Sequence, residues 1–370
     1  MRRFILNRIT FLLVIIVIII PLVLLFLERA EGPPLHDLKK ARIAINDAKK
    51  SNAQIYQKKL IAEADAYYDS SFAEIKRQNE IFILKRDYSK STYYAIKSKE
   101  KASEANRLAT LKGKNLKKYV EFKIDSVESF VKEFKTLFVQ LPLEKKILGH
   151  FSKGDILLGE SKLDFRNGKF SEAEKKINLS YNHINIAYTE AKTMLTDYFI
   201  QYESWIGWVD DAVSQSKKDK KKLIVIDKFS KKIYLYKNGK QNYTTDVELG
   251  KNWIGDKNYS GDKATPEGKY KIVKKIDTPH TKYYKALLLD YPNADDVKRF
   301  NHAKTNGKIP ANSKIGGLIE IHGSGGKGIN WTDGCIAVHD TDMNKIFSFS
   351  ETGTEVVIVG SLLSLSEILN

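Results

Sequence analysis

The chain has 370 residues, which is enough for two domains with accessory segments. Hydrophobic residues make up 42% of the sequence and charged residues 29%, a balance that excludes a wholly disordered or fibrous protein. The 62 Lys and Arg residues exceed the 45 Asp and Glu residues and give a formal net charge of +17, which favours anionic surroundings. The single cysteine, Cys335, excludes an internal disulfide framework and a zinc site built from several cysteines.

Residues 1–32 are predicted to form a short cytoplasmic N-terminus and a transmembrane anchor. Residues 11–27 (FLLVIIVIIIPLVLLFL) carry no charged or polar side chain, and with the milder residues 4–10 they are long enough to cross about 30 Å of hydrocarbon. The alternatives are a buried core helix and a cleaved signal peptide, but the run is longer than a usual signal core. Arginines before the run and glutamates after it predict a single-pass protein of the cytoplasmic (inner) membrane, with the rest of the chain in the periplasm or on the extracellular face.

Residues 33–215 have the pattern of helices. They are poor in glycine, and apolar or small residues recur at spacings of three and four, as in ARIAINDAKK. Residues 41–105 resemble a small helical domain of unknown function found in bacterial envelope proteins, and residues 154–188 resemble a tetratricopeptide-like helical hairpin. We therefore expect an all-α region, which is a candidate surface for envelope protein partners.

The lysine-rich run at residues 216–222 is predicted to be a solvated linker, although it could also grip an acidic polymer. Beyond it, residues 223–360 change to the alternating pattern of β-strands, and Asn238-Gly239 between two such runs is a strong hairpin signal. Further strands are expected at residues 270–273, 286–289, 318–322 and 356–359. We predict a mostly antiparallel β domain, followed by a C-terminal tail at residues 361–370.

One stretch, residues 319–338 (IEIHGSGGKGINWTDGCIAV), contains the groups needed for nucleophilic chemistry. A cysteine thiolate is a nucleophile and a nearby histidine can take its proton, so we expect His322 at the end of one strand to meet Cys335 at the start of the next. Gly334 permits a tight turn whose amide groups face an oxyanion, and a backbone carbonyl near Gly323 holds the imidazole tautomer. The alternative is a buried structural cysteine beside a strand-end histidine, but a lone exported thiol argues for a function.

Five ordered segments of residues 223–360 resemble the catalytic domain of the L,D-transpeptidase family, cysteine enzymes that remodel bacterial peptidoglycan. The segments are LIVIDKFSKKIYLYKNGK, ATPEGKYKI, YYKALLLDYPN, GGLIEIHG and TDGCIAV. The family pattern is His-Gly followed, after a loop, by Ser/Thr-x-Gly-Cys. The resemblance implies that Cys335 is the nucleophile, that His322 with Gly323 supplies the base, that Gly334 is part of the oxyanion site, and that carbapenem-type β-lactams form an adduct on Cys335.

The sequence departs from the family pattern at two positions. Many members have a histidine immediately before the Gly-Cys pair and an arginine two residues after the cysteine, whereas this chain has Asp333 and Ala337. The missing arginine removes a substrate-positioning contact, and Lys327 is a candidate source of the missing charge unless it is a solvated loop lysine. Asp333 is expected to raise the pKa of the thiol unless it points away. The candidate substrate-binding residues are Tyr283, Tyr284, Ser324, Lys327, Trp331, Thr332 and Asp333, although the aromatic ones could instead belong to the core.

The prediction for the whole chain is a membrane-anchored L,D-transpeptidase of cell-wall biogenesis, in which Cys335 forms an acyl-thioester with a peptidoglycan stem peptide. Transfer of the acyl group to an amine forms a cross-link or attaches a protein, whereas transfer to water makes the enzyme a carboxypeptidase or hydrolase. The alternative from another class is a non-catalytic cell-wall-binding protein whose helices recruit partners. With one cysteine and scattered histidines, no metal site or cofactor is expected, and the lack of nucleotide- and DNA-binding motifs argues against nucleic acid as a partner.

Overall fold

The computed structural model describes residues 11, 13–23 and 32–369. The predicted anchor, residues 1–32, lies mostly outside the described residues, and its described part contains the short π-helical segment η1 (Ile15–Ile19). No helix among the described residues combines the length and the apolar character needed to cross a membrane. The membrane anchor therefore stays a prediction.

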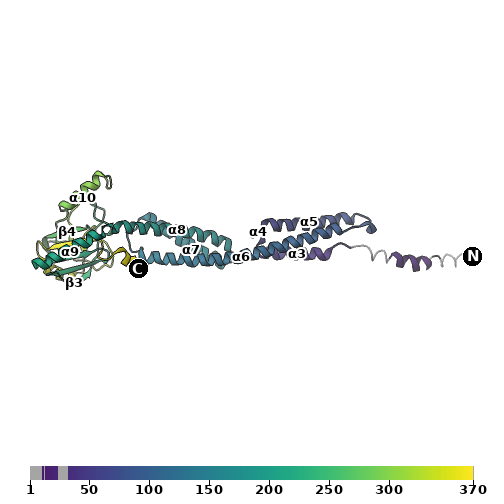
Figure 1. The fold of residues 1–370 in the computed structure, drawn as a ribbon, viewed down its shortest axis with the longest axis horizontal. Coiled ribbons are helices and arrows are strands. Elements are labelled where there is room, and N and C mark those ends of the chain that lie inside the picture. Colours follow the sequence, from purple (N-terminus) through teal and green to yellow (C-terminus); the bar gives the residue numbers. More distant parts are fainter. Residues whose placement is uncertain (1–10, 12, 24–31, 370) are drawn as a thin grey trace, which may run out of the picture. The chain divides into compact units, whose positions relative to one another are not determined.

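The chain divides into two compact units, residues 1–127 with 157–179 and residues 128–156 with 180–370. The predicted all-α middle region is confirmed (Figure 1). Its elements are α3 (Leu35–Lys50), α4 (Ala53–Tyr56), α5 (Lys58–Asn79), the 3₁₀ turn η2 (Ile83–Lys85), α6 (Ser89–Leu137), α7 (Lys145–Arg166), α8 (Phe170–Tyr198), the 3₁₀ turn η3 (Phe199–Gln201) and α9 (Tyr202–Asp219).

In the first unit, α3 and α5 form an antiparallel hairpin. Leu38 near the start of α3 shares a buried cluster with Ile75 near the end of α5. Ile45 near the end of α3 shares another with Ile61 near the start of α5, and alanines of α3, α5 and α6 fill the space between them. The spacing of three and four in the sequence thus places small residues along the buried faces, where they let the helices approach closely.

In the second unit, α7 and α8 pack closely around Gly154. A Cβ atom at this position would lie 2.6 Å from Cδ1 of Ile184, so the packing leaves no room for a side chain there. The hydroxyl of Ser180 donates a hydrogen bond to the carbonyl oxygen of Gly154 at 2.7 Å. Both contacts draw the α8 backbone against α7.

The predicted linker at residues 216–222 is wrong, because α9 continues to Asp219 and β1 begins at Lys222. Helix α9 packs on β1, β2 and β8 of the sheet. It buries Trp205, Val209, Ala212 and Ser216 at helical spacing. Lys217 and Lys218 are exposed in the last turn of α9, Lys220 is its C-cap and Lys222 begins β1, so this charged run joins a helix directly to a strand.

The β domain of the second unit is built on one eight-stranded sheet with the order β3-β2-β1-β8-β4-β5-β6-β7. The strands are β1 (Lys222–Asp227), β2 (Lys232–Lys237), β3 (Lys240–Asp246), β4 (Gly268–Asp277), β5 (Lys285–Leu289), β6 (Glu320–His322), β7 (Ile336–Ala337) and β8 (Glu355–Val359). The predicted hairpin at Asn238-Gly239 joins β2 and β3, and both turn residues have positive φ.

The sheet is mixed, whereas the sequence predicted a mostly antiparallel one. Five neighbouring pairs are antiparallel, but β1 pairs with β8 and β6 pairs with β7 in parallel. Strand β8 follows the helix α11 (Asp340–Phe349) and inserts between β1 and β4, and the long stretch of chain between β1 and β8 permits their parallel pairing. Beyond β3, Glu248 forms an antiparallel bridge with Ala337 of β7, so the sheet curls until its two edges meet.

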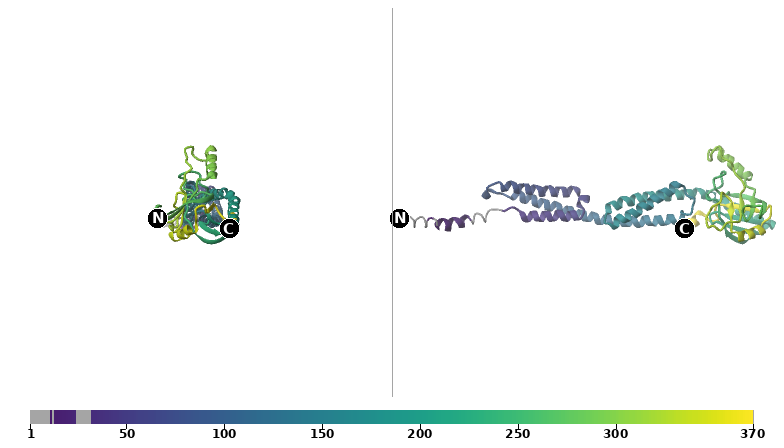
Figure 2. Two further views of the ribbon diagram at one scale, coloured as in Figure 1. Left: turned by 90° about the vertical axis from the view of Figure 1, so that its left-hand side faces the viewer. Right: turned by 180° about the vertical axis from the view of Figure 1, so that it is seen from behind.

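Two further helices complete the domain. Helix α10 (Ala294–Thr305) begins with a capping box formed by Asn293 and Asp296, and it projects from the sheet in each view (Figure 2). The short helix α12 (Leu365–Leu369) lies in the predicted C-terminal tail. Helix α11 packs against β5, and the candidate site lies at β6 and β7, next to β5 in the sheet.

Candidate active site

His322 is the last residue of β6, and its tautomer is set by a backbone carbonyl. Its Nδ1 lies 2.6 Å from the carbonyl oxygen of Gly323, which can only accept, so Nδ1 carries the proton and donates it. The Nε2 atom is buried and has no hydrogen-bond partner. The lone pair of Nε2 is therefore available to take a proton from another group.

Two aromatic rings hold the His322 imidazole. The Tyr283 ring stacks on it at 3.6 Å between centroids with an interplanar angle of 9°, and the Trp331 ring meets it edge-on at 5.9 Å and 71°. Burial, together with the charges of Lys282 and Lys327, lowers the pKa of His322 to about 4, although the hydrogen bond to the Gly323 carbonyl acts in the opposite direction. The imidazole is therefore neutral at pH 7.

Cys335 directly precedes β7, whose residues Ile336 and Ala337 pair with Ile321 and His322 of β6. Because side chains alternate along a strand, Cys335 is expected on the same face of the sheet as Ala337 and His322. The Sγ atom donates to the carbonyl oxygen of Leu318 at 3.6 Å. The thiol is thus expected on the same face of the sheet as the imidazole, but its hydrogen bond goes to Leu318.

The surroundings of Cys335 favour the protonated thiol. Burial raises the pKa of Cys335, and the Glu320 carboxylate raises it further, whereas a backbone hydrogen bond from Glu320 and the charges of Lys282 and Lys257 lower it. Asp333 is exposed and is not among these causes. The carboxylate that acts on the thiol comes from β6, which the sequence reasoning did not identify.

Gly334 shapes the turn that leads into Cys335. Its φ of +134° and a Cβ position 2.6 Å from the Ala264 carbonyl oxygen require glycine. Its amide donates to Oγ1 of Thr332 at 3.2 Å, and that hydroxyl donates to the carbonyl oxygen of Cys335 at 2.7 Å. Thr332 therefore fixes the turn and engages the Gly334 amide that was predicted to face an oxyanion.

The thiol of Cys335 opens into a pocket of about 650 Å³. The lysines that line the pocket are Lys251, Lys257, Lys263 and Lys282, and among the described residues Asp333 is the one acidic side chain that joins them. Lys257 is nearly buried and is held by Asp262 at 2.7 Å. A pocket with this balance of charge suits an anionic ligand, such as a peptide with free carboxylates.

The pocket contains some of the predicted substrate-binding residues and not others. Tyr283, Trp331, Thr332 and Asp333 line it together with Cys335. The other three candidates do not line it. Tyr284 is partly exposed and its hydroxyl contacts Asn344, the Ser324 amide donates to Asp340, and the ammonium group of Lys327 lies 3.3 Å from the centroid of the Trp331 ring.

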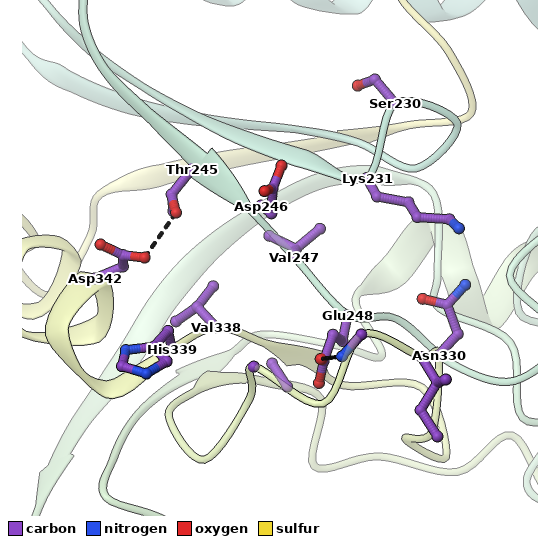
Figure 3. Close-up of a pocket in the computed structure, with 14 residues that line it drawn as sticks. Ser230, Lys231, Thr245, Asp246, Val247, Glu248, Asn330, Val338, His339 and Asp342 are labelled. Atoms are coloured by element: carbon purple, nitrogen blue, oxygen red, sulfur yellow. Dashed lines mark hydrogen bonds between the residues drawn. The ribbon is translucent and has the colours of Figure 1, made fainter.

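Glu248 is bonded to the glycine-rich loop and lines a second pocket of about 470 Å³ (Figure 3). Its carboxylate is largely buried and accepts from the amide of Gly328 and from Nε1 of Trp331, both at 2.6 Å. Since the Trp331 ring contacts His322, this carboxylate holds the loop against the imidazole. Ala337, which replaces the arginine of the family pattern, lines the same pocket and is fully buried.

The C-terminal part of the chain, residues 221–358, matches the family model described as YkuD, L,D-transpeptidase catalytic domain. Below, residues 221–358 are called the YkuD domain, after the family model that they match. No curated protein matches the chain. The resemblance stated from the sequence is therefore confirmed for the C-terminal domain.

Solved structures similar to the YkuD domain come from several bacteria. Bd1075 of Bdellovibrio bacteriovorus is 21% identical, with 40% of this chain and 52% of that chain covered and a TM-score of 0.30. A mutant L,D-transpeptidase of Enterococcus faecium is 18% identical, with 38% and 50% covered and a TM-score of 0.26. An L,D-transpeptidase from Mycobacterium smegmatis is 12% identical, with 38% and 59% covered and a TM-score of 0.26. This chain thus spans about half the length of the structures it resembles.

Several residues of the YkuD domain that shape the site were missed from the sequence. Lys251, Lys257 and Lys263 belong to the segment between β3 and β4, and nothing in its composition relates it to Cys335. Glu248 was missed for the same reason. Lys282 is the exception, because its place beside Tyr283 was a usable signal. Long-range curling of the sheet, which local sequence does not encode, brings these residues to the site.

Proposed function

We propose that this protein is an L,D-transpeptidase that acts on peptidoglycan stem peptides through an acyl-thioester on Cys335. One arrangement supports the proposal most strongly: a neutral imidazole whose Nε2 has no partner ends β6, beside the strand that Cys335 precedes, and the Cys335 thiol lines a pocket rich in lysine. The match of residues 221–358 to the YkuD family model supports the reaction class. The catalytic roles of Cys335 and His322 are part of this proposal.

In the first half-reaction, Nε2 of His322 takes the proton of Sγ as the sulfur attacks the carbonyl carbon of an L-centre residue bonded to a D-residue. The amide of Cys335 donates to the oxyanion, because the amide of Gly334 is already bonded to Thr332. When the peptide C–N bond breaks, the imidazolium gives its proton to the leaving nitrogen. The terminal D-amino acid departs and an acyl-thioester remains on Cys335.

In the second half-reaction, an amine takes the acyl group. The amine attacks the thioester carbon and its proton passes to Nε2 of His322, after which the C–S bond breaks and the thiolate recovers that proton. A stem-peptide amine as acceptor gives a cross-link and a protein lysine gives an anchored protein. Water as acceptor gives the carboxypeptidase or hydrolase reaction.

The pocket lysines suit the stem peptide that donates the acyl group in this reaction. A stem peptide ends in a D-residue carboxylate, and ammonium groups in the pocket offer it charge-assisted hydrogen bonds. Lys282 lies above the Tyr283 ring at 4.9 Å and so stands beside the stacked pair that includes His322. We assign to these lysines the positioning role that the arginine missing at Ala337 has in the family pattern.

A non-catalytic wall-binding protein is the second candidate, and one observation favours it. The Cys335 thiol donates to the Leu318 carbonyl, not to Nε2 of His322. Leu318 is 75% exposed and has a φ of +58°, so it occupies a strained position at the rim of the pocket. Turnover requires the thiol to rotate from this carbonyl toward the imidazole, whereas a binding protein has no such requirement.

We further propose that residues 1–32 anchor the protein in the cytoplasmic membrane with the catalytic domain outside. The proposal rests on the apolar run at residues 11–27 and on the arginines that precede it. The helical region follows the anchor in the sequence, and in this proposal it lies on the same side of the membrane as the enzyme, where it can contact other envelope proteins.

Mass spectrometry of the intact protein tests the proposed chemistry. We expect incubation with a tetrapeptide stem or with a carbapenem to add one acyl group to the wild type, with His322→Ala slowed by roughly 10²- to 10⁴-fold and Cys335→Ala unlabelled. Analysis of the released products by the same method identifies the acceptor.

Equal labelling of all three proteins would place the nucleophile elsewhere. An unlabelled wild type that still binds peptidoglycan would favour the wall-binding alternative. Thr332→Ser is the matched control, because it keeps the hydroxyl that bonds the Gly334 amide and the Cys335 carbonyl and is expected to keep the activity.

A further inference from the structure

The turn between α5 and α6 exposes three consecutive large apolar side chains. Residues 80–86, here named the hairpin tip, follow the end of α5 and include η2. Phe82, Ile83 and Leu84 are 68%, 40% and 53% exposed. A contiguous apolar group at the end of a helical hairpin is unusual on a soluble surface and is typical of a contact site.

The hairpin tip is held in shape by polar side chains. Arg86 donates from Nε to the carbonyl oxygen of Ile81 at 2.9 Å and from Nη2 to that of Asn79 at 3.0 Å. The hydroxyl of the buried Tyr88 donates to the Asn79 side chain at 2.7 Å. Because these bonds fix the backbone of the turn, its apolar side chains are presented outward in a defined arrangement and need little ordering on binding.

Basic residues surround the apolar group. Along residues 76–90 the cations are Lys76, Arg77, Lys85, Arg86 and Lys90, and the acidic side chains are Glu80 and Asp87. Arg77 is paired with Glu74, whose buried carboxylate adds one more negative charge nearby. Apolar residues at the centre with an excess of cations around them match an anionic lipid surface, whose headgroups attract the cations and whose acyl boundary accepts the apolar side chains.

The hairpin tip lies at the end of the α3–α5 hairpin where α3 begins. Leu38, in the first turn of α3, clusters with Ile75 and with Tyr88, which directly follows the tip. Lys49 near the other end of α3 pairs with Asp65 at 3.3 Å, which confirms the antiparallel arrangement. In the sequence, the apolar run ends at Leu27 and α3 begins at Leu35. Even when fully extended, the chain between these two residues spans at most about 27 Å.

We infer that the hairpin tip docks on the surface of an anionic phospholipid bilayer, with Phe82, Ile83 and Leu84 at the boundary between headgroups and acyl chains. The distance argument rests on the proposed anchor, whereas the exposure, the charge and the fixed turn do not. Docking at this second point would hold the first helical unit against the membrane in a defined orientation. The proposed partner is a lipid surface, and the experiment below distinguishes it from a second copy of the protein.

The test uses the full chain in proteoliposomes, carrying Cys335→Ser so that one introduced cysteine takes an environment-sensitive NBD label. Labels at Leu84→Cys, Ile55→Cys and Ile18→Cys report the tip, the opposite end of the α3–α5 hairpin and the apolar run. Ile55 is the matched control, because it is 59% exposed and lies on α4. The liposomes contain phosphatidylglycerol or, for comparison, phosphatidylcholine alone, and lipids with a quencher on the acyl chain report depth.

We expect the label at residue 84 to become brighter, to shift to shorter wavelength and to be quenched by acyl-chain quenchers in phosphatidylglycerol liposomes, and the label at residue 55 to behave as in water. High salt should weaken the signal at residue 84, because exposed charges are screened. A residue 84 label that resembles the residue 55 label overturns the inference, whether or not residue 18 enters lipid. A bright residue 84 label without lipid quenching overturns it as well, since that result indicates burial against protein.

Discussion

Burial shifts both His322 and Cys335 away from their charged forms. The pKa of His322 falls to about 4 and the pKa of Cys335 rises, so at pH 7 the resting site contains a neutral imidazole and a protonated thiol. A preformed thiolate–imidazolium pair would require the opposite shifts. In our proposal the proton therefore moves when the substrate arrives, and His322 acts as a general base.

The pH dependence of alkylation tests this resting state. The thiolate reacts with iodoacetamide and the thiol does not, so a raised pKa predicts a rate that grows by about tenfold per pH unit from pH 6 to pH 8 without a plateau. His322→Ala should show nearly the same slope, because the imidazole is neutral throughout this range. A plateau below pH 7 that His322→Ala abolishes would contradict the prediction and indicate an ion pair.

Substitution of Gly334 is expected to destabilise the turn that leads into Cys335. Gly334→Ala places Cβ against the Ala264 carbonyl at a φ of +134°, and strain plus overlap should lower the free energy of unfolding by about 2–4 kcal/mol. Gly328→Ala is the control, because φ is +72° but nothing lies within 4 Å, so a loss of about 1 kcal/mol is expected. Equal losses in urea denaturation would show that the contact with Ala264 is unimportant.

Helix α9 is an element of the YkuD domain's core, although it precedes the region that the family model covers. The Trp205 ring is fully buried, and a Cβ at Gly360 would lie 2.2 Å from it. Its Nε1 donates to Glu267 at 3.1 Å, and Glu267 in turn pairs with the fully buried Lys228 at 2.7 Å. The indole thus caps a buried ion pair as well as apolar surface, and its removal exposes both.

Trp205→Ala should therefore destabilise the catalytic domain itself. We expect a loss of roughly 3–5 kcal/mol, the usual range for removing a buried aromatic ring, with near-complete loss of acylation at 37 °C. Trp208→Ala, on the same helix but only partly buried, is expected to lose less than half as much. Thermal unfolding followed by circular dichroism distinguishes them, and similar values for both would mean that α9 packs loosely.

The elements that were predictable from the sequence are those determined by local pattern. A continuous apolar run located β1, alternation located β2, Asn238-Gly239 located the hairpin, and the alanine spacing located the helices. The sequence predicted His322 at the end of one strand and Cys335 at the start of the next, and the structure has His322 at the end of β6 and Cys335 directly before β7, but the sequence did not predict that these strands are parallel. The parallel pairing of β1 with β8 was not predictable, because most of the domain separates the two strands in the sequence and no turn joins them.

The end of α9 and the pocket lysines were missed for related reasons. A lysine run on the solvated face of a helix has the same composition as a linker, and only the buried residues at helical spacing distinguish the two. Lys257 and Lys282 line the same pocket as Cys335 but belong to separate segments, which the curled sheet brings together. Charges brought together in this way leave no motif in the sequence.

At the scale of the whole molecule, the proposed topology is testable with reporter fusions. With residues 1–32 as the anchor, alkaline phosphatase fused after Asn370 should be active and β-galactosidase inactive, because the first enzyme needs the oxidising exterior and the second the cytoplasm. Deletion of residues 1–32 is the control and should reverse the two activities. An active β-galactosidase fusion of the full chain would exclude the proposed orientation.

The protonated state of Cys335 also affects its resistance to damage. The chain has one cysteine, so a sulfenic acid formed on Cys335 has no resolving thiol within the molecule and can advance to irreversible sulfinic and sulfonic acids. Peroxide reacts with the thiolate, and the raised pKa keeps that form scarce while the pocket is empty. In our proposal, the burial that keeps the thiol protonated until substrate binds therefore also protects the nucleophile from oxidation.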